Sequence, residues 1–148
     1  MTTIAADLEQ MVSDSKVSLA QKNLSYPALK IVKVGDAVYG AAGDGGDCTR
    51  FLRWASGGFK GTEPKWGTAP GSEDAVIGLI LRPTGIFCWV WGDPEPERIE
   101  APFFAIGSGG KAARAAMMMG ASIIEAVNIA IEVDPGSGPP LQVLKLKE

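Results

Sequence analysis

Short apolar segments separated by turn residues restrict the folds open to this chain. Several of them alternate apolar and polar residues at the period of a β-strand, as residues 30–34 and 141–146 do. Glycine (19) and proline (10) account for a fifth of the 148 residues and supply turns between the segments. Because the strands are short and alternating, we expect antiparallel sheets rather than a doubly wound parallel sheet.

The same pattern predicts where the strands of this single domain, residues 1–148, begin and end. A turn is expected at 25–27, and a loop that carries no core residue at 57–72. The sequence GDPEPERIE, after residue 91, is expected to be a charged loop. The expected strands span residues 2–6, 11–13, 30–34, 37–42, 75–81, 86–91, 103–106 and 141–146.

Three helices are expected between these strands. The first is short: it can start in the segment 43–47, with Asp47 as a candidate N-cap, and continue over residues 49–55 until Gly57 and Gly58 stop it. The second begins in the glycine-rich segment 107–110 and ends at Met119. The third begins at Ser122, where Glu125 completes a capping-box pattern. Helices that cover antiparallel sheets predict a layered α+β domain.

Composition excludes several classes of function. The net charge of -3 offers no basic field for nucleic acid, and no apolar stretch approaches the ~20 residues that cross a bilayer. The first eleven residues contain acidic but no basic side chains, so we expect no secretion signal and a cytoplasmic protein. The chain has no histidine and two distant cysteines, which excludes Ser-His and Cys-His catalysis and indicates neither a metal nor a cofactor.

Thr2 suggests a way to move protons without histidine. Removal of Met1 would expose a hydroxyl and an α-amine on one residue. An α-amine has a pKa of about 7.7–8.0 and can act as a general base near neutral pH. Many chains begin Met-Thr, so this pattern alone is weak. If Met1 stays in place, the nitrogen of Thr2 is an amide and this mechanism fails.

Six landmarks in order resemble those of proteasome β-subunits and bacterial HslV-type peptidases. They are TTIAAD at 2–7, MVSDS at 11–15, Lys30 with Val34, GAAGD at 40–44, AIGSGG at 105–110 and DPGSG at 134–138. The resemblance implies a four-layer αββα sandwich of the N-terminal nucleophile hydrolase type. This chain offers one short helix and a Gly/Pro-rich loop where that family has two long helices, so we expect a reduced helical layer there.

The resemblance also implies roles for individual residues in a threonine-type peptidase. Thr2 matches the nucleophile, and Lys30 matches the lysine whose ammonium lowers the pKa of the threonine hydroxyl. Asp14 matches the acid that orients this lysine. Gly40 matches the residue whose N–H stabilises the oxyanion. The residues that match the network around the threonine amine are Ser108, Asp134 and Ser137.

Substrates and partners follow from the resemblance in outline. The positions that match the family's first specificity pocket are all apolar and favour cleavage after hydrophobic residues; they are Val17, Ala28, Val32 and Val38. The expected substrates are peptides or unfolded proteins. The expected assembly is a homo-oligomeric ring fed by an ATP-dependent unfoldase, with no part for nucleic acid or a membrane. The missing helix leaves ring formation itself open.

Two alternatives compete with the peptidase. The sequence GSGGK, residues 107–111, could bind a phosphate at a helix N-terminus. It does not meet the Walker pattern, because Ala105 replaces the first glycine and Ala112 follows the lysine. The second alternative is a catalytically inactive structural or regulatory subunit with the same fold.

Overall fold

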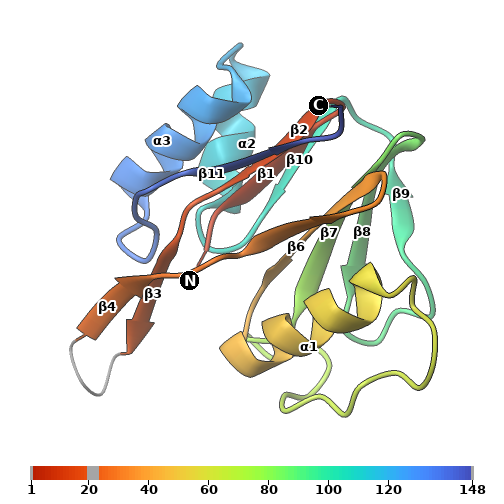
Figure 1. Cartoon of the computed structure of the whole chain (residues 1–148). Helices are drawn as coiled ribbons and strands as arrows, with labels where there is room; N and C mark the ends of the chain where they lie inside the picture. The colour runs from red at the N-terminus through yellow and green to blue at the C-terminus, as the bar shows by residue number, and fades with distance from the viewer. Residues whose placement is uncertain (1, 20–23, 148) are drawn as a thin grey trace.

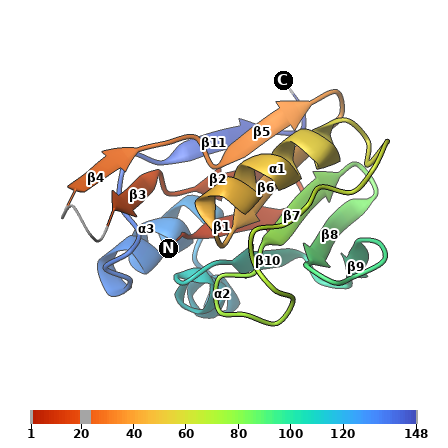
Figure 2. The same cartoon turned by 90° about the horizontal axis from the view of Figure 1, so that it is seen from below.

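Two stacked β-sheets with helices on both outer faces form the body of the protein. The computed structural model describes residues 2–19 and 24–147. Helices α2 (Gly110–Met118) and α3 (Ile123–Val133) cover one sheet, and α1 (Gly45–Ser56) covers the other (Figure 1). Figure 2 shows α1 and the pair α2 and α3 on opposite sides of the two sheets. The order of layers is αββα, which confirms the expected sandwich and its reduced layer of one helix.

Both sheets are antiparallel. One has the order β10-β1-β2-β11, so the first and last strands of the chain share a sheet. The other has the order β5-β6-β7-β8-β9 and follows the chain as a meander. The bounds are β1 (Ile4–Asp7), β2 (Gln10–Ser13), β5 (Ile31–Val34), β6 (Ala37–Ala42), β7 (Ile77–Arg82), β8 (Gly85–Val90), β9 (Glu97–Ile99), β10 (Phe103–Ile106) and β11 (Gln142–Lys145).

Alternation along the strands supplies a separate core to each interface between layers. On β1, Ile4 and Ala6 face the other sheet, whereas Ala5 faces α2 and α3. On β6, Val38 faces the first sheet and Tyr39 faces α1. Strands with both faces buried need apolar residues at every position, which explains their nearly continuous apolar sequence.

Helix α1 starts and stops within the predicted segments, but its predicted N-cap was wrong. The helix begins at Gly45, and its N-cap is Asp44, whose side chain accepts a hydrogen bond from the backbone of Asp47. The side chain of Asp47 is buried and instead accepts hydrogen bonds from Gly67 and Thr68 in the following loop. Asp44 and Asp47 are three positions apart, and sequence spacing alone does not show which of them caps the helix.

The loop at 57–72 contributes core residues, contrary to expectation. Phe59 and Trp66 pack against the cluster between α1 and its sheet. There Trp66 lies 5.4 Å from the ring of Trp89, and Phe59 lies 4.9 Å from that of Trp54. Aromatic side chains of the loop therefore cover part of the surface that a second helix would cover.

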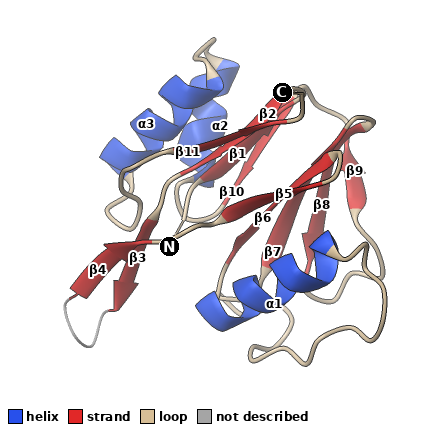
Figure 3. Ribbon diagram, viewed as in Figure 1, coloured by secondary structure: helices blue, strands red, loops and turns tan. Residues whose placement is uncertain are grey.

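Two further segments were predicted as irregular and are strands. Residues 25–27, expected as a turn, belong to β4 (Leu24–Pro27), which pairs with β3 (Lys16–Leu19). This hairpin extends away from the sandwich (Figure 3). The charged segment after residue 91 contains β9, which pairs with β8 at the sheet edge. Charged residues on an edge strand discourage pairing with other chains.

The third helix follows the prediction closely. Ser122 caps α3, and its hydroxyl accepts a hydrogen bond from the backbone of Glu125. The Glu125 carboxylate in turn accepts one from the backbone of Ser122, which completes the predicted capping box. Ile123, Ala126, Val127 and Ala130 pack against the sheet. Helix α2 begins after Gly109, as expected, and its last residue is Met118.

Candidate active site

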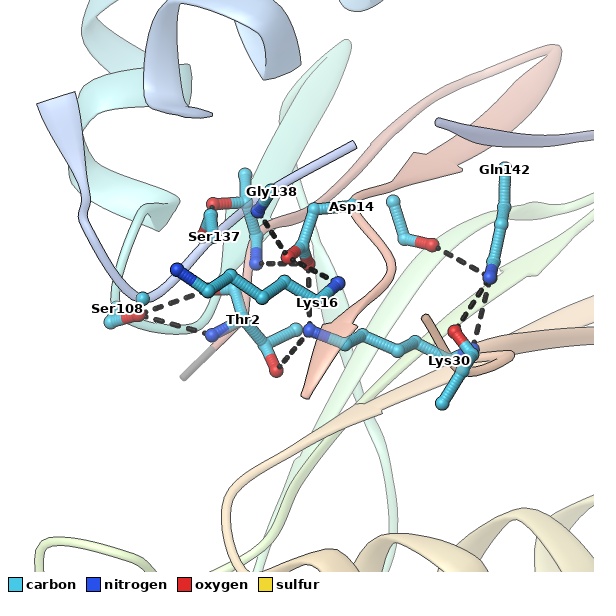
Figure 4. Close-up of polar contacts among 12 residues, drawn as sticks. Thr2, Asp14, Lys16, Lys30, Ser108, Ser137, Gly138 and Gln142 are labelled. Atoms are coloured by element: carbon cyan, nitrogen blue, oxygen red, sulfur yellow. Dashed lines mark hydrogen bonds and ion pairs between the residues drawn. The ribbon is translucent and has the colours of Figure 1, made fainter. Parts of the chain in front are cut away.

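Thr2 lies two residues before β1, between Ser108 and Lys30, which supply its polar contacts. Figure 4 shows Ser108 on one side of Thr2 and Lys30 on the other. Only 6% of Thr2 is exposed. Its carbonyl accepts a hydrogen bond of 3.1 Å from the backbone N–H of Gly109, which fixes the residue against the turn that precedes α2.

The hydroxyl of Thr2 contacts a buried ion pair. Lys30 Nζ donates to Thr2 Oγ1 at 3.2 Å and lies 2.9 Å from Asp14 Oδ1. Lys30 is 8% exposed and Asp14 is fully buried. A buried ion pair holds a fixed positive charge beside the hydroxyl at a position where water screens it weakly. This charge stabilises an alkoxide on Thr2.

Hydrogen bonds to both oxygens of the Asp14 carboxylate compensate for its burial. Oδ1 also accepts a hydrogen bond of 3.0 Å from the backbone of Thr3. Oδ2 accepts hydrogen bonds from the backbone N–H groups of Lys16 (3.2 Å) and Gly138 (3.0 Å). Donors from three separate segments therefore hold Asp14, as burial of a charge requires.

The backbone nitrogen of Thr2 leads into a second polar network. It donates to Ser108 Oγ at 3.0 Å, and that hydroxyl donates to Asp134 Oδ2 at 2.6 Å. Ser137 Oγ donates to the same carboxylate oxygen at 2.7 Å. Because its proton is then used, Ser137 accepts from the hydroxyl of Thr3 at 2.7 Å. The two networks meet at Thr3 and form a closed ring of hydrogen bonds around Thr2.

Asp134 is ionised within this network. Burial raises the pKa of its carboxyl, but hydrogen bonds from Ser108, Ser137 and the backbone of Gly136 outweigh burial and lower it below the usual value. Asp134 therefore stays an acceptor at neutral pH and orients the Ser108 hydroxyl, which leaves that oxygen free to accept from the Thr2 nitrogen.

Glycines near Ser108 allow the backbone to approach Thr2. Gly107 has a φ of +94°, and a Cβ at this position would collide with the carbonyl of Thr2. A Cβ at Gly109 would collide with the hydroxyl of Thr3. The GSGG sequence therefore packs the turn before α2 against residues 2 and 3.

The structure brings six of the seven predicted catalytic residues into this ring; they are Thr2, Asp14, Lys30, Ser108, Asp134 and Ser137. Gly40 is outside it. This glycine pairs with Ile31 inside the sheet, and its α-carbon faces Ile4 and Met11. Its assignment as the oxyanion donor stays a prediction.

Two cavities meet at Thr2. One, of about 430 Å³, lies on the Lys30 side and includes Lys16 and Leu52 in its wall. The other, of about 610 Å³, lies on the Ser108 side and includes Glu73 and Asp74. The first is therefore cationic and apolar, and the second is acidic.

The residues predicted to form a specificity pocket separate into two pairs. Val17 and Ala28 line the cavity on the Lys30 side. Val38 is fully buried between the two sheets, and Val32 packs in the layer beneath α1. The structure does not bring these last two to the cavity, because inward positions on β5 and β6 are used by the cores.

Gln142 is a residue of this site that the sequence analysis missed. Its Oε1 accepts hydrogen bonds from the backbone of Lys30 (3.0 Å) and from Ser13 Oγ (3.1 Å). Its Nε2 donates to the carbonyl of Ala28 at 2.6 Å. The partners are separated from Gln142 by more than one hundred residues in sequence, and one glutamine in an alternating strand gives no local signal of such contacts.

Cys48 lines the cavity on the Lys30 side. Burial, with a contribution from the charge of Asp44, raises the pKa of its thiol to about 12. The thiol is therefore protonated at neutral pH and is a poor nucleophile. Within residues 2–19 and 24–147 the structure contains no cluster of three or more Cys, Asp or Glu side chains that could hold a metal ion. Over the same residues, no helix has the length and apolar character to cross a membrane.

Solved structures share this architecture over nearly the whole chain. The crystal structure of eukaryotic HslV from Trypanosoma brucei superposes with a TM-score of 0.72 at 21% identity and covers 97% of this chain and 98% of its own. BPH from Thiobacillus denitrificans has a TM-score of 0.65 at 21% identity and covers 99% and 98%. Its complex with epoxomicin has a TM-score of 0.65 at 20% identity, with coverage of 99% of both chains.

These similarities establish the class of fold. The chain has the N-terminal nucleophile hydrolase sandwich fold of HslV and BPH, which confirms the predicted resemblance at the level of the fold. No protein-family model matches the sequence, and no curated protein is significantly similar to it.

Proposed function

We propose that this protein is a threonine-type peptidase that uses Thr2 as its nucleophile after Met1 is removed. The observation that carries the proposal is the contact of 3.2 Å between the Thr2 hydroxyl and the ammonium of Lys30, which Asp14 holds in place. The fold shared with HslV, and with a BPH structure that contains epoxomicin, supports it. Met1 lies outside the described residues.

In the first step, the Thr2 hydroxyl attacks the carbonyl carbon of the scissile peptide bond. The α-amine of Thr2 takes the hydroxyl proton, and Lys30 stabilises the developing alkoxide. The bond from Oγ1 to the carbonyl carbon forms, and the carbonyl oxygen becomes an oxyanion. The Ser108 hydroxyl, already bonded to the Thr2 nitrogen at 3.0 Å, keeps the amine oriented for this transfer.

In the second step, the carbon–nitrogen bond breaks and the α-ammonium returns its proton to the leaving amine. This requirement places the leaving segment on the Ser108 side, in the cavity that includes Glu73 and Asp74. The acyl segment then occupies the cavity on the Lys30 side. Water, deprotonated by the amine, hydrolyses the ester and restores Thr2.

The cavity on the Lys30 side favours apolar or acidic side chains over basic ones. Val17, Ala28 and Leu52 give it aliphatic surface, and its charged residues are Lys16 and Lys30. We therefore propose cleavage after hydrophobic residues. Equal cleavage of fluorogenic peptides after arginine would contradict this specificity.

We further propose that the peptidase works as a homo-oligomeric ring in the cytoplasm, with peptides or unfolded proteins as substrates and an ATP-dependent unfoldase as partner. An exposed apolar surface supports the oligomer. Met118 and Met119, which are adjacent at the end of α2, are 73% and 89% exposed. Exposed apolar clusters of this kind mark surfaces that associate.

The decisive comparison uses two forms of the same protein, one that begins at Thr2 and one that retains Met1. We expect the first to hydrolyse a fluorogenic peptide and the second to be inactive, because its Thr2 nitrogen is an amide. Thr2→Ser in the first form should keep measurable activity, and Thr2→Ala should remove it. Equal inactivity of all forms would favour the alternative, a structural or regulatory subunit with this fold.

A further inference from the structure

Leu29 is a strongly exposed apolar side chain that lines the cavity on the Lys30 side. It is 82% exposed, lines that cavity together with Thr2, and directly precedes Lys30 in sequence. A single exposed leucine is ordinary on a protein surface. Leu29, however, lines the same cavity as the candidate nucleophile, where an exposed apolar side chain can contact a substrate.

The backbone on both sides of Leu29 is fixed by one side chain. The carboxamide of Gln142 donates to the carbonyl of Ala28 at 2.6 Å and accepts from the N–H of Lys30 at 3.0 Å. It therefore imitates the peptide group of a neighbouring strand across residues 28–30. Figure 4 shows Gln142 at the backbone end of Lys30, away from the ammonium.

The side chain of Gln142 is itself held in place. Gln142 belongs to β11, and Ser13 on the paired strand β2 donates its hydroxyl to the same Oε1 at 3.1 Å. A second bond, from the N–H of Ala28 to the carbonyl of Ser15 at 2.7 Å, holds the start of the segment. The exposed leucine is therefore carried by an ordered backbone. When a ligand covers such an exposed apolar side chain, the removal of its surface from water stabilises the complex.

The surroundings indicate what that ligand is. The described residues that line the cavity include Val17 and Leu52 and contain no acidic side chain. Under the proposed function, the acyl segment of the substrate lies on this side of Thr2. We infer that Leu29 is a specificity-determining residue that packs against an apolar side chain of the acyl segment. Gln142 is a positioning residue that holds Leu29 and the backbone of Lys30 together. This inference rests on the proposed function.

The test measures specificity with peptide coumarin amides that carry leucine or alanine at each position before the scissile bond. In wild-type protein we expect one position at which leucine gives the higher kcat/KM. Leu29→Ala should reduce that preference by about tenfold, mainly through KM, and leave kcat near wild type. Leu29→Asp should reduce it further. Leu8→Ala is the matched control, because Leu8 is 54% exposed and does not line either cavity.

The positioning role of Gln142 is tested by measuring kcat and KM of a second set of variants. Gln142→Met removes all three hydrogen bonds and should both raise KM and lower kcat, because it releases Leu29 and Lys30 together. Val143→Ala, at the neighbouring position on β11, is the control and should leave both constants near wild type, because Val143 is 38% exposed and lines neither cavity. Thermal melting of each variant separates misplacement of the segment from unfolding.

Each result decides between distinct accounts. Wild-type protein that cleaves no peptide would overturn the proposed function and this inference with it. Active protein in which Leu29→Ala keeps the full preference for leucine would overturn this inference alone. A change in oligomer size without a change in specificity would assign Leu29 to a contact between subunits.

Discussion

The buried ion pair between Lys30 and Asp14 links catalysis to stability. The two groups are 2.9 Å apart, and Asp14 is sealed from solvent. A charge in such a place is tolerated only with its partner and its backbone donors. A substitution at either position therefore changes the hydroxyl of Thr2 and the folded state together.

Lys30→Met should abolish peptide hydrolysis and lower the free energy of unfolding by about 3–5 kcal/mol, because it leaves the Asp14 carboxylate buried without its cation. The double variant Lys30→Met with Asp14→Asn should recover part of that stability but no activity. Denaturant unfolding and a peptide assay measure the two quantities. Full additivity of the two substitutions would contradict the pairing.

Cys48 should resist alkylation although it lines a cavity. Burial raises the pKa of its thiol to about 12, so the reactive thiolate is scarce at pH 8. We expect iodoacetamide to label Cys48 slowly in folded protein and rapidly in denaturant, measured by peptide mass. Fast labelling in the folded protein would show that the thiol is ionised at this pH.

The landmarks that resemble a known family were enough to select most of the residues that the structure brings together in the candidate site. Thr2, Lys30, Asp14 and the Ser108 network occur in recognisable landmarks, and the structure joins them. Gln142 could not be predicted, because its role depends on the pairing of β11 with β2 and on the return of residues 28–30 to the same edge. Val38 shows the converse: its apolar character fits a pocket and a core equally well.

At the scale of elements, α1 and the loop after it form one unit. The buried carboxylate of Asp47 accepts hydrogen bonds from Arg50 (2.6 Å), from the backbone of Gly67 (2.8 Å) and from Thr68. Aromatic side chains of the loop complete the packing. Glycines and prolines dominate the loop and predict an external segment. The packing of Phe59 and Trp66 depends on tertiary contacts, such as that of Trp66 with Trp89, which local sequence does not indicate.

Asp47→Asn should destabilise the protein by about 2 kcal/mol at pH 7, since it removes a buried charged acceptor from the donors of Arg50, Gly67 and Thr68. Burial raises the pKa of Asp47, but the donors from Gly67, Thr68 and Arg50 outweigh it and lower the pKa below 3.8. The contribution of Asp47 is therefore complete above the unfolded pKa and is lost as pH falls through the lower folded pKa. Unfolding curves of both proteins from pH 7 to pH 2 should converge at the acid end. A constant difference would contradict the linkage.

Gly78 on β7 allows α1 to pack closely against its sheet. A Cβ at this position would collide with the ring of Phe51, which is fully buried on α1. Gly78→Ala should therefore lower the free energy of unfolding by about 1–3 kcal/mol or more through overpacking. Gly45→Ala is the matched control, because this glycine also lacks a positive φ and a Cβ there would meet nothing within 4 Å. Equal melting temperatures of wild type and Gly78→Ala would refute the packing.

At the scale of the molecule, the order αββα places the polar network around Thr2 at one edge of the sandwich. Strand β1 begins at this edge and β2 ends there. The turn before α2, the segment after α3 and the start of β5 lie at the same edge. Alternation and turn residues predicted most of these elements and the layered class. The β3–β4 hairpin could not be predicted, because residues 25–27 contain a proline in what proved to be a strand.

The proposed oligomer should depend on the exposed methionines at the end of α2. Met118 and Met119 present apolar surface that water contacts in the single chain. We expect light scattering to report an oligomer for the wild type and a smaller species for the variant Met118→Glu with Met119→Glu, because charge opposes burial. A monomeric wild-type protein would contradict the ring.

The central claim is that Thr2 becomes an N-terminal nucleophile, and covalent labelling tests it most directly. Untagged protein is incubated with a peptide epoxyketone, the class of reagent that requires both a hydroxyl and a free α-amine on one threonine, and its intact mass is measured. We predict loss of one methionine and a single adduct on Thr2, absent from Thr2→Ala and strongly reduced in Lys30→Met. Retention of Met1 with no adduct would contradict the account and assign the chain a non-catalytic role.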